Sequence, residues 1–224
     1  MREGLRVGVV GATGLLGQEL IAALDEESAP LGELHVFASE ESLGQEVDFR
    51  GERLPVQTPV ESLRGLDVVL LCTPASTALD WVRVALRSEV PCIDCSGALV
   101  GSVDVPMAMT SLGAYEELQA APLISSPPGP SLAWGPVLAA IQREAGLRRV
   151  LGTLLHSASA AGRRGIETLS ERTLALLNQY SDDGAGLETN APRAFECHAH
   201  GVDSGKGPAA NQEATLVEVR GGGS

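Results

Sequence analysis

Aromatic side chains are scarce in this sequence, with three Phe, two Trp and two Tyr among 224 residues. The core must therefore be filled mainly by Leu, Val, Ile and Ala. Basic side chains are also few, since 16 Lys and Arg stand against 29 Asp and Glu and the net charge is −13. An acidic surface without a basic stripe repels phosphate backbones, so we expect no nucleic-acid partner.

Long apolar runs are missing as well. No stretch approaches the roughly 20 apolar residues of a membrane-spanning helix, and residues 1–4 do not begin a secretory signal. We therefore expect a cytoplasmic protein without membrane contact. Cysteine is also rare, with Cys72, Cys92, Cys95 and Cys197. Cys72 lies in an apolar run, where a free thiol most often serves as a small hydrophobic side chain.

The first half of the chain alternates short apolar runs with amphipathic segments. Continuous apolar strands that alternate with helices indicate a parallel sheet covered on both faces. The predicted fold is thus α/β, with a Rossmann-like doubly wound parallel sheet. Strands are expected at 5–10, 34–38, 67–72 and 90–93, a hairpin at 46–56, one helix after Gly14 with Leu16, Leu20 and Leu24 on its buried face, and another at 76–88, capped by Ser76, with Leu79, Val82 and Leu86 inward.

Beyond about residue 115 the pattern changes, and we expect a second, truncated α/β domain. The predicted organisation is a cofactor domain over 1–125, a reduced dimerisation or catalytic-type domain over 126–220, and a flexible tail over 221–224. Its expected elements are strands at 122–126, 149–156 and 215–219, a helix from an N-cap at Ser131 to Ala145 that Pro136 kinks or displaces, and a helix at 165–179.

A glycine turn separates the first strand from the first helix. Gly11 permits the tight turn, Gly14 lets the backbone approach a pyrophosphate, and Gly17 allows close helix–strand contact. The helix N-terminus then offers unpaired N–H groups and a positive dipole end to phosphates. This spacing favours nucleotide binding, and the alternative is a tight turn without a ligand.

Several segments resemble the aspartate-semialdehyde dehydrogenase family, and its Usg-type paralogues with an eroded active site look most similar. The similar segments are 7–20 around the glycine turn, 37–44, 92–98 and 155–167. The resemblance implies a homodimer and NADP-dependent conversion of an acyl phosphate to an aldehyde through a cysteine thioester. It also implies these cofactor-binding residues: Gly11, Thr13, Gly14, Leu15, Leu16, Gly17, Ser39, Glu41, Thr73 and Ser96.

The family's nucleophile is missing from the segment that resembles its cysteine motif. That segment reads Ser-Pro-Pro-Gly-Pro-Ser over 126–131, and Gly129 stands at the cysteine position. Glycine offers no atom for covalent catalysis. His156 replaces a family glutamine, and Val100 replaces an expected arginine. We expect a non-catalytic, nucleotide-binding or scaffold protein; the alternatives are an active NAD(P)-dependent semialdehyde dehydrogenase and a shortened form of a longer homologue.

Acidic residues follow the second predicted strand, where the family carries basic ones for the 2′-phosphate of NADP. Glu40 and Glu41 repel a phosphate but can accept a hydrogen bond from a ribose hydroxyl. We expect NAD rather than NADP, and the alternative is that these are surface acids without a ligand.

Two further interpretations concern the cysteines. Cys92 and Cys95, with the later Cys197, His198 and His200, suggest a zinc site, but strand alternation separates the first two and no metal is expected. Cys95 is also a candidate displaced nucleophile, although no adjacent cation lowers its pKa. Buried or incidental thiols are the default interpretation.

Overall fold

The computed structural model describes residues 4–27, 30–58, 62–109, 115–152, 154–155 and 157–177. These residues divide between two compact units, one up to Gly152 and the other beyond it. Each unit is described by itself. None of the helices in these ranges is long and apolar enough to cross a membrane.

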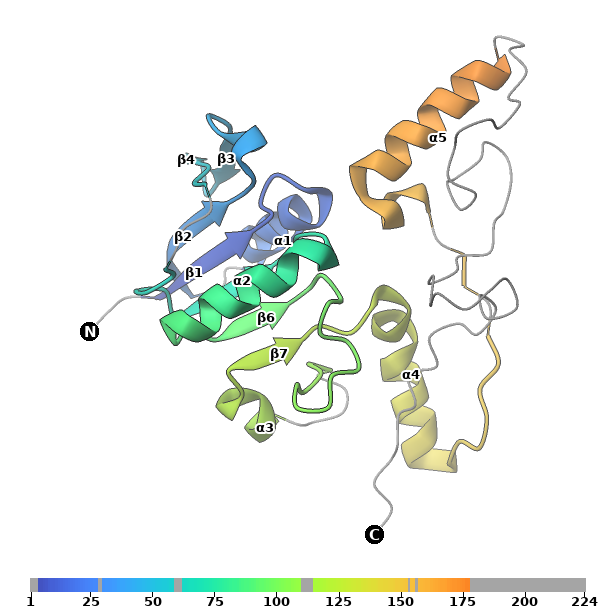
Figure 1. Ribbon diagram of the computed structural model, residues 1–224. Helices are drawn as coiled ribbons and strands as arrows, with labels where there is room; N and C mark the ends of the chain where they lie inside the picture. The colour runs from blue at the N-terminus through green and yellow to red at the C-terminus, as the bar shows by residue number, and fades with distance from the viewer. Residues whose placement is uncertain are drawn as a thin grey trace. The chain divides into compact units, whose positions relative to one another are not determined.

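Five parallel strands form the central sheet of the first unit, in the order β2-β1-β5-β6-β7 (Figure 1). The chain thus starts at an inner strand, β1, moves outward to the edge strand β2, and returns to the other side of β1. This reversal of direction creates a switch point beside β1, where doubly wound sheets bind ligands. The strands are β1 (Leu5–Val10), β2 (Leu31–Phe37), β5 (Val68–Leu71), β6 (Cys92–Asp94) and β7 (Leu123–Ser125), with an antiparallel hairpin of β3 (Glu46–Phe49) and β4 (Glu52–Pro55).

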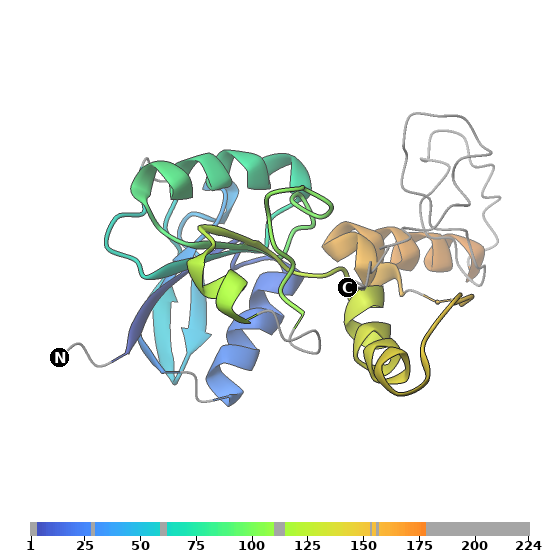
Figure 2. The ribbon, with the colours of Figure 1, turned by 90° about the horizontal axis from the view of Figure 1, so that it is seen from below.

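Helices cover both faces of this sheet, as Figure 2 shows for α1 (Leu15–Glu26) on one side and α2 (Ala75–Ser88) on the other. Strand alternation distributes the apolar side chains between two clusters. Val7 and Val9 belong to the cluster on the α1 side, whereas Val10 belongs to the cluster on the α2 side. The predicted Rossmann-like parallel sheet is thus confirmed. Apolar strands of this kind are stable only when both faces of the sheet are covered.

The buried faces of the two helices differ from the prediction by about one residue. Leu16 is 49% exposed and α1 buries Gly17 and Ile21 instead, while Leu20 and Leu24 are partly buried. In α2, Leu79 and Leu86 are largely exposed. Small side chains let this helix approach the sheet closely, which the Leu pattern did not anticipate. The residues that α2 buries are Ala78, Val82, Ala85 and Ser88.

Two predicted helix caps are wrong. α2 begins at Ala75 with Pro74 as its N-cap rather than at Ser76, and the Thr77 hydroxyl donates to the Pro74 carbonyl at 3.0 Å. The second wrong cap is that of α4 (Gly129–Ala145), which follows β7 and the six-residue helix α3 (Tyr115–Ala120). Its N-cap is Pro128, so Ser131 lies inside the helix. A proline is tolerated in the first turn because its missing N–H would have no intrahelical acceptor there.

Pro136 neither ends α4 nor displaces its start, since the helix runs through it. The strand predicted at 149–156 is wrong for its described residues, which have no regular structure. A strand needs a partner edge, and Leu151 and Leu155 instead remain 80% and 81% exposed. Apolar composition alone therefore did not produce a strand here.

The second unit contains the 3₁₀ turn η3 (Ala158–Ala161) and α5 (Gly162–Leu177). This confirms the helix predicted at 165–179 within the described residues. The strand predicted at 215–219 and the tail at 221–224 lie outside them. The domain boundary near residue 125 stays a prediction.

Candidate nucleotide-binding site

The glycine turn follows β1 at the carboxyl end of the sheet. Gly11 has a φ of +84°, in the left-handed region that favours glycine. A Cβ on Gly11 would also come within 2.7 Å of the Cys72 carbonyl oxygen and 3.0 Å of the Thr73 nitrogen. The turn therefore lies directly against the end of β5, and both conditions require glycine.

Gly17 explains the close approach of α1 to the turn. A Cβ there would lie 2.2 Å from the Gly11 carbonyl oxygen and 2.9 Å from the Ala12 Cα. Gly14 is the N-cap of α1, and because it has no side chain it makes no capping hydrogen bond to the helix. The first N–H groups of a helix have no intrahelical acceptor, so those of Leu15 and Leu16 are suited to an anion.

The segment after β2 packs beside this turn. The Thr13 and Ser42 hydroxyls are 3.0 Å apart and hydrogen-bonded, which ties the glycine turn to the 3₁₀ turn η1 (Glu40–Ser42). Ser39 is the N-cap of η1, and Ser39, Glu40 and Glu41 are exposed. The two acidic residues noted in the sequence, Glu40 and Glu41, therefore lie next to the glycine turn and are not buried in the core.

Thr73 contributes a polar atom at the same edge. Its hydroxyl is buried, and within the described ranges it has no hydrogen-bond partner. Buried polar groups are normally hydrogen-bonded, and an exception calls for an explanation. A ligand that approaches the Gly11–Thr73 contact would supply the missing partner.

Ser96 lies in a loop that Asp94 organises. Asp94 is fully buried at the end of β6, and its carboxylate accepts hydrogen bonds from the Ser96 N–H at 2.9 Å and the Leu99 N–H at 2.8 Å. The Ser96 hydroxyl also donates to it at 2.5 Å. Sequence reasoning missed Asp94; the Asp94-Cys95-Ser96 order, in which a side chain can bond the backbone two residues on, is the signal that predicts such a loop.

The predicted site residues therefore converge at the carboxyl ends of neighbouring strands. Residues of the glycine turn follow β1, Ser39 and Glu41 follow β2, Thr73 follows β5, and Ser96 follows β6. Which of them contact a nucleotide stays a prediction.

The three described cysteines have different environments. Burial raises the pKa of Cys92 to about 12, as expected for a thiol in the apolar cluster under α2. A hydrogen bond from the Cys72 thiol lowers the pKa of half-buried Cys95. The sequence shows no cation beside Cys95, and it could not reveal this neighbouring thiol, which is 23 residues away in the chain.

No group of three or more His, Cys, Asp or Glu side chains within the described ranges could hold a metal ion. Cys197, His198 and His200 lie outside these ranges, as does His156.

Gly129 is the first residue of α4, and a Cβ added to it would meet nothing within 4 Å. No steric constraint in the described structure therefore requires glycine at the position where the resemblance places a nucleophile.

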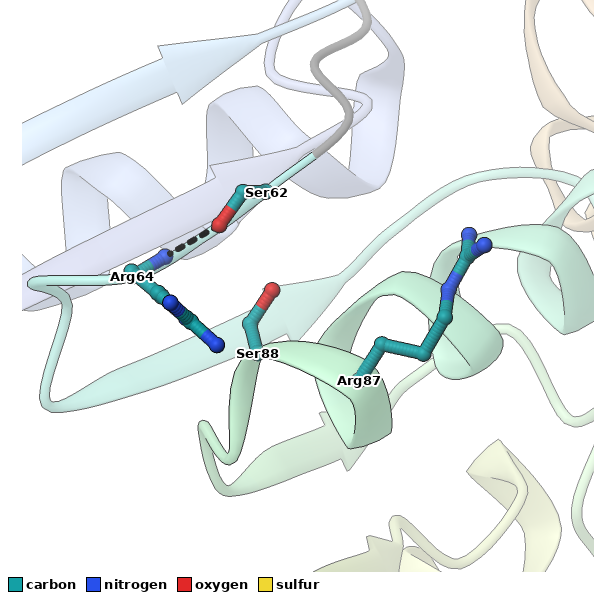
Figure 3. Close-up of a pocket in the computed structure, with 4 residues that line it drawn as sticks. All are labelled: Ser62, Arg64, Arg87 and Ser88. Carbon is teal, nitrogen blue, oxygen red and sulfur yellow. Dashed lines mark hydrogen bonds between the residues drawn. The ribbon is translucent and has the colours of Figure 1, made fainter.

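A separate hollow of about 650 Å³ lies at the amino ends of β5 and β6, between Ser62, Arg64, Arg87 and Ser88 (Figure 3). Ser62 accepts a hydrogen bond from the Arg64 N–H at 3.3 Å, and Ser88 accepts one from the Leu63 N–H at 2.9 Å. The Arg87 side chain extends away from the other three and donates to the Arg83 carbonyl at 3.3 Å. Ligands of doubly wound sheets bind at the opposite, carboxyl edge, so this hollow is not part of the candidate site.

Comparison with known proteins agrees with this fold. Residues 6–120 match the family model described as the NAD-binding domain of semialdehyde dehydrogenase. The chain is 38% identical over 181 residues to a USG-1 protein homolog of Pseudomonas aeruginosa, covering 80% of this chain and 54% of that protein. It is 30% identical over 176 residues to aspartate-semialdehyde dehydrogenase of Aquifex aeolicus, covering 77% of this chain and 52% of the relative.

Among solved structures, aspartate semialdehyde dehydrogenase II of Vibrio cholerae superposes with a TM-score of 0.78 at 27% identity. The match covers 92% of this chain and 63% of that one. The chain spans about half the length of the curated relatives it matches.

Proposed function

The chain belongs to the semialdehyde dehydrogenase family, and we propose that it binds a nicotinamide nucleotide, with NAD favoured over NADP, and acts without covalent catalysis. The observation that carries nucleotide binding is the turn from Gly11 to Gly17. Two of its glycines are required by close backbone contacts, Gly11 with the end of β5 and Gly17 with the turn itself. A turn that was merely a connection would not need this approach together with an uncapped helix N-terminus.

The preference for NAD rests on charge. Glu40 and Glu41 are exposed in η1, which the Thr13–Ser42 hydrogen bond holds against the glycine turn. Carboxylates there would repel a 2′-phosphate and accept a hydrogen bond from a 2′-hydroxyl.

The non-catalytic role rests on Gly129. The resemblance places the nucleophile at this position, the N-terminal end of α4, where the helix dipole would lower the pKa of a thiol. A glycine has no such group, although the surrounding space would admit one. Loss of a covalent nucleophile costs on the order of a millionfold in rate where it has been measured in a protease.

Nucleotide binding is tested by thermal denaturation with NAD and NADP at equal concentrations. At about a hundred times Kd, NAD should stabilise the protein by about 2.7 kcal/mol, which raises Tm by about 5–10 °C at this size. NADP should give a smaller shift. Glu41→Arg should reverse the order of the two nucleotides, while Glu52→Arg, an exposed substitution on β4, should leave it unchanged. A larger shift with NADP for the unmodified protein would refute the preference, and no shift with either would refute binding.

The non-catalytic part is tested on the same protein with aspartate semialdehyde, phosphate and either nucleotide. We expect reduced nucleotide to form no faster than it does without the protein, and the intact mass of the protein to stay unchanged. Turnover with an acyl group trapped on any side chain would overturn this part of the proposal while leaving nucleotide binding intact.

We also propose that the protein forms a homodimer through residues beyond 125. Val137 and Ile141, which are four residues apart and so lie on one face of α4, remain 59% and 42% exposed, and apolar side chains gathered on one face are candidates for an interaction site. Light scattering should give twice the monomer mass. Ile141→Glu should shift the protein toward monomer, whereas Leu79→Glu on the exposed side of α2 should not. A monomeric unmodified protein at micromolar concentration would contradict this proposal.

A further inference from the structure

Cys72 and Cys95 lie side by side on adjacent strands of the sheet. β5 and β6 pair in parallel with Leu70 opposite Ile93 and Leu71 opposite Asp94, and the next pair in this register is Cys72 and Cys95. The ladder continues to this point, because the Cys95 N–H donates to the Leu71 carbonyl at 2.9 Å. Residues paired in this way present their side chains to the same face of the sheet.

The two thiols interact through their side chains, since each changes the pKa of the other. Neighbouring strands are about 4.8 Å apart, which falls within the about 4.4–6.8 Å that the Cα atoms of a disulfide usually span. The backbone therefore already has the separation that a bond between the two sulfur atoms requires.

The pair has one reactive and one protected member. Cys95 is half-buried, whereas Cys72 is buried. The interaction with the Cys72 thiol lowers the pKa of Cys95, while burial and the nearby Asp94 carboxylate act in the opposite direction. The same contact raises the pKa of Cys72. Thiolate character and access favour attack by Cys95 on an oxidant, with Cys72 as the resolving thiol.

We propose that Cys72 and Cys95 form a reversible disulfide when the protein meets a peroxide. The Cys95 thiolate attacks one peroxide oxygen, the O–O bond breaks, and the other oxygen leaves as water after protonation. The Cys72 sulfur then attacks the Cys95 sulfenic acid, the S–O bond breaks, and a second water leaves. Each thiol loses one hydrogen, and the peroxide accepts the two electrons that the sulfur atoms lose.

Cys92 does not compete for this bond. It occupies the strand position that faces α2, within the apolar cluster that contains Leu71, whereas the neighbouring Ile93 packs with the cluster on the α1 side. The bond would join the ends of β5 and β6 beside Gly11, whose turn already touches the Cys72 carbonyl. Its formation depends on the sheet register and not on nucleotide binding.

The test exposes the folded, reduced protein to hydrogen peroxide and digests it with trypsin and the protease that cleaves before Asp. Cleavage before Asp94 separates Cys92 from Cys95, so Cys72 falls in peptide 67–79, Cys92 in 88–93 and Cys95 in 94–103. We expect a linked pair of 67–79 and 94–103, with the loss of two hydrogens. The free thiols should fall from four to two, and dithiothreitol should restore them.

Variants assign the roles. Cys95→Ser and Cys72→Ser should each abolish the link, and in Cys72→Ser a dimedone adduct should appear on Cys95. The matched control Cys197→Ser should form the link as the unmodified protein does. A link from Cys95 to Cys92 or Cys197, or no link between 67–79 and 94–103 in protein that circular dichroism shows to be folded, would overturn the proposal.

Discussion

Gly17→Ala should lower the stability of the protein by about 3 kcal/mol, the upper part of the range for overpacking a close contact. The added Cβ would lie 2.2 Å from the Gly11 carbonyl oxygen and 2.9 Å from the Ala12 Cα. Both neighbours are backbone atoms, so they cannot rotate away as a flexible side chain would. Either α1 or the turn before it must move.

This movement should also reduce nucleotide binding. In the proposed site, the first N–H groups of α1 and the turn at Gly11 bind the anion together, and the substitution separates them. We expect thermal denaturation to give a Tm lower by about 10 °C, together with loss of the NAD-dependent shift. Both quantities come from the same melting experiment.

The matched control is Gly129→Ala. Gly129 also lies in the first turn of a helix, but a Cβ there would meet no atom within 4 Å. Its Tm should therefore stay at the unmodified value or rise slightly, as glycine-to-alanine changes do at unstrained sites. Equal Tm values for the two variants would show that the contact at Gly17 relaxes without cost.

The sheet was largely predictable because its strands are continuous apolar runs. Segments such as 5–10 and 67–72 in the sequence correspond closely to β1 and β5. A strand buried on both faces needs apolar side chains at every position, so local composition contains the information. The glycine turn was predictable for a related reason, since only glycine satisfies its positive φ and its close contacts.

The order and register of the strands were not predictable from local patterns. Cys72 and Cys95 lie opposite each other because β5 pairs with β6 in one particular register, and nothing near either cysteine in the sequence encodes that register. The same limit explains the error at 149–156. Apolar residues there resemble a strand, but a strand forms only where a partner edge is present.

The helix faces were misjudged for a steric reason. Leucine spacing suggested which side of α2 faces the sheet, yet Ala78 and Ala85 are fully buried while Leu79 is 42% exposed. Small residues let a helix axis lie closer to the sheet, which buries more of the strand side chains below it. A scale of hydrophobicity ranks leucine above alanine, so it places the buried face of α2 about one residue away from the observed one.

Asp94 is the buried polar residue on which the loop after β6 depends. Its carboxylate accepts two backbone N–H groups, from Ser96 and Leu99, as well as the Ser96 hydroxyl. Asp94→Ala would leave these donors without an acceptor in a buried setting, and each unsatisfied donor costs about 1–3 kcal/mol. We expect a total loss of about 3 kcal/mol or more, and a Tm lower by about 10 °C.

A graded series separates lost hydrogen bonds from lost volume. Asp94→Asn keeps the size and one oxygen acceptor but replaces the other oxygen with a donor group, so its Tm should fall between the unmodified protein and Asp94→Ala. Asp80→Ala is the control, because Asp80 is 75% exposed and pairs with exposed Arg83 at 2.5 Å; its Tm should match the unmodified protein. If Asp94→Asn were as unstable as Asp94→Ala, the loop would depend on the carboxylate charge, and a Tm unchanged in both would mean that the loop forms without Asp94.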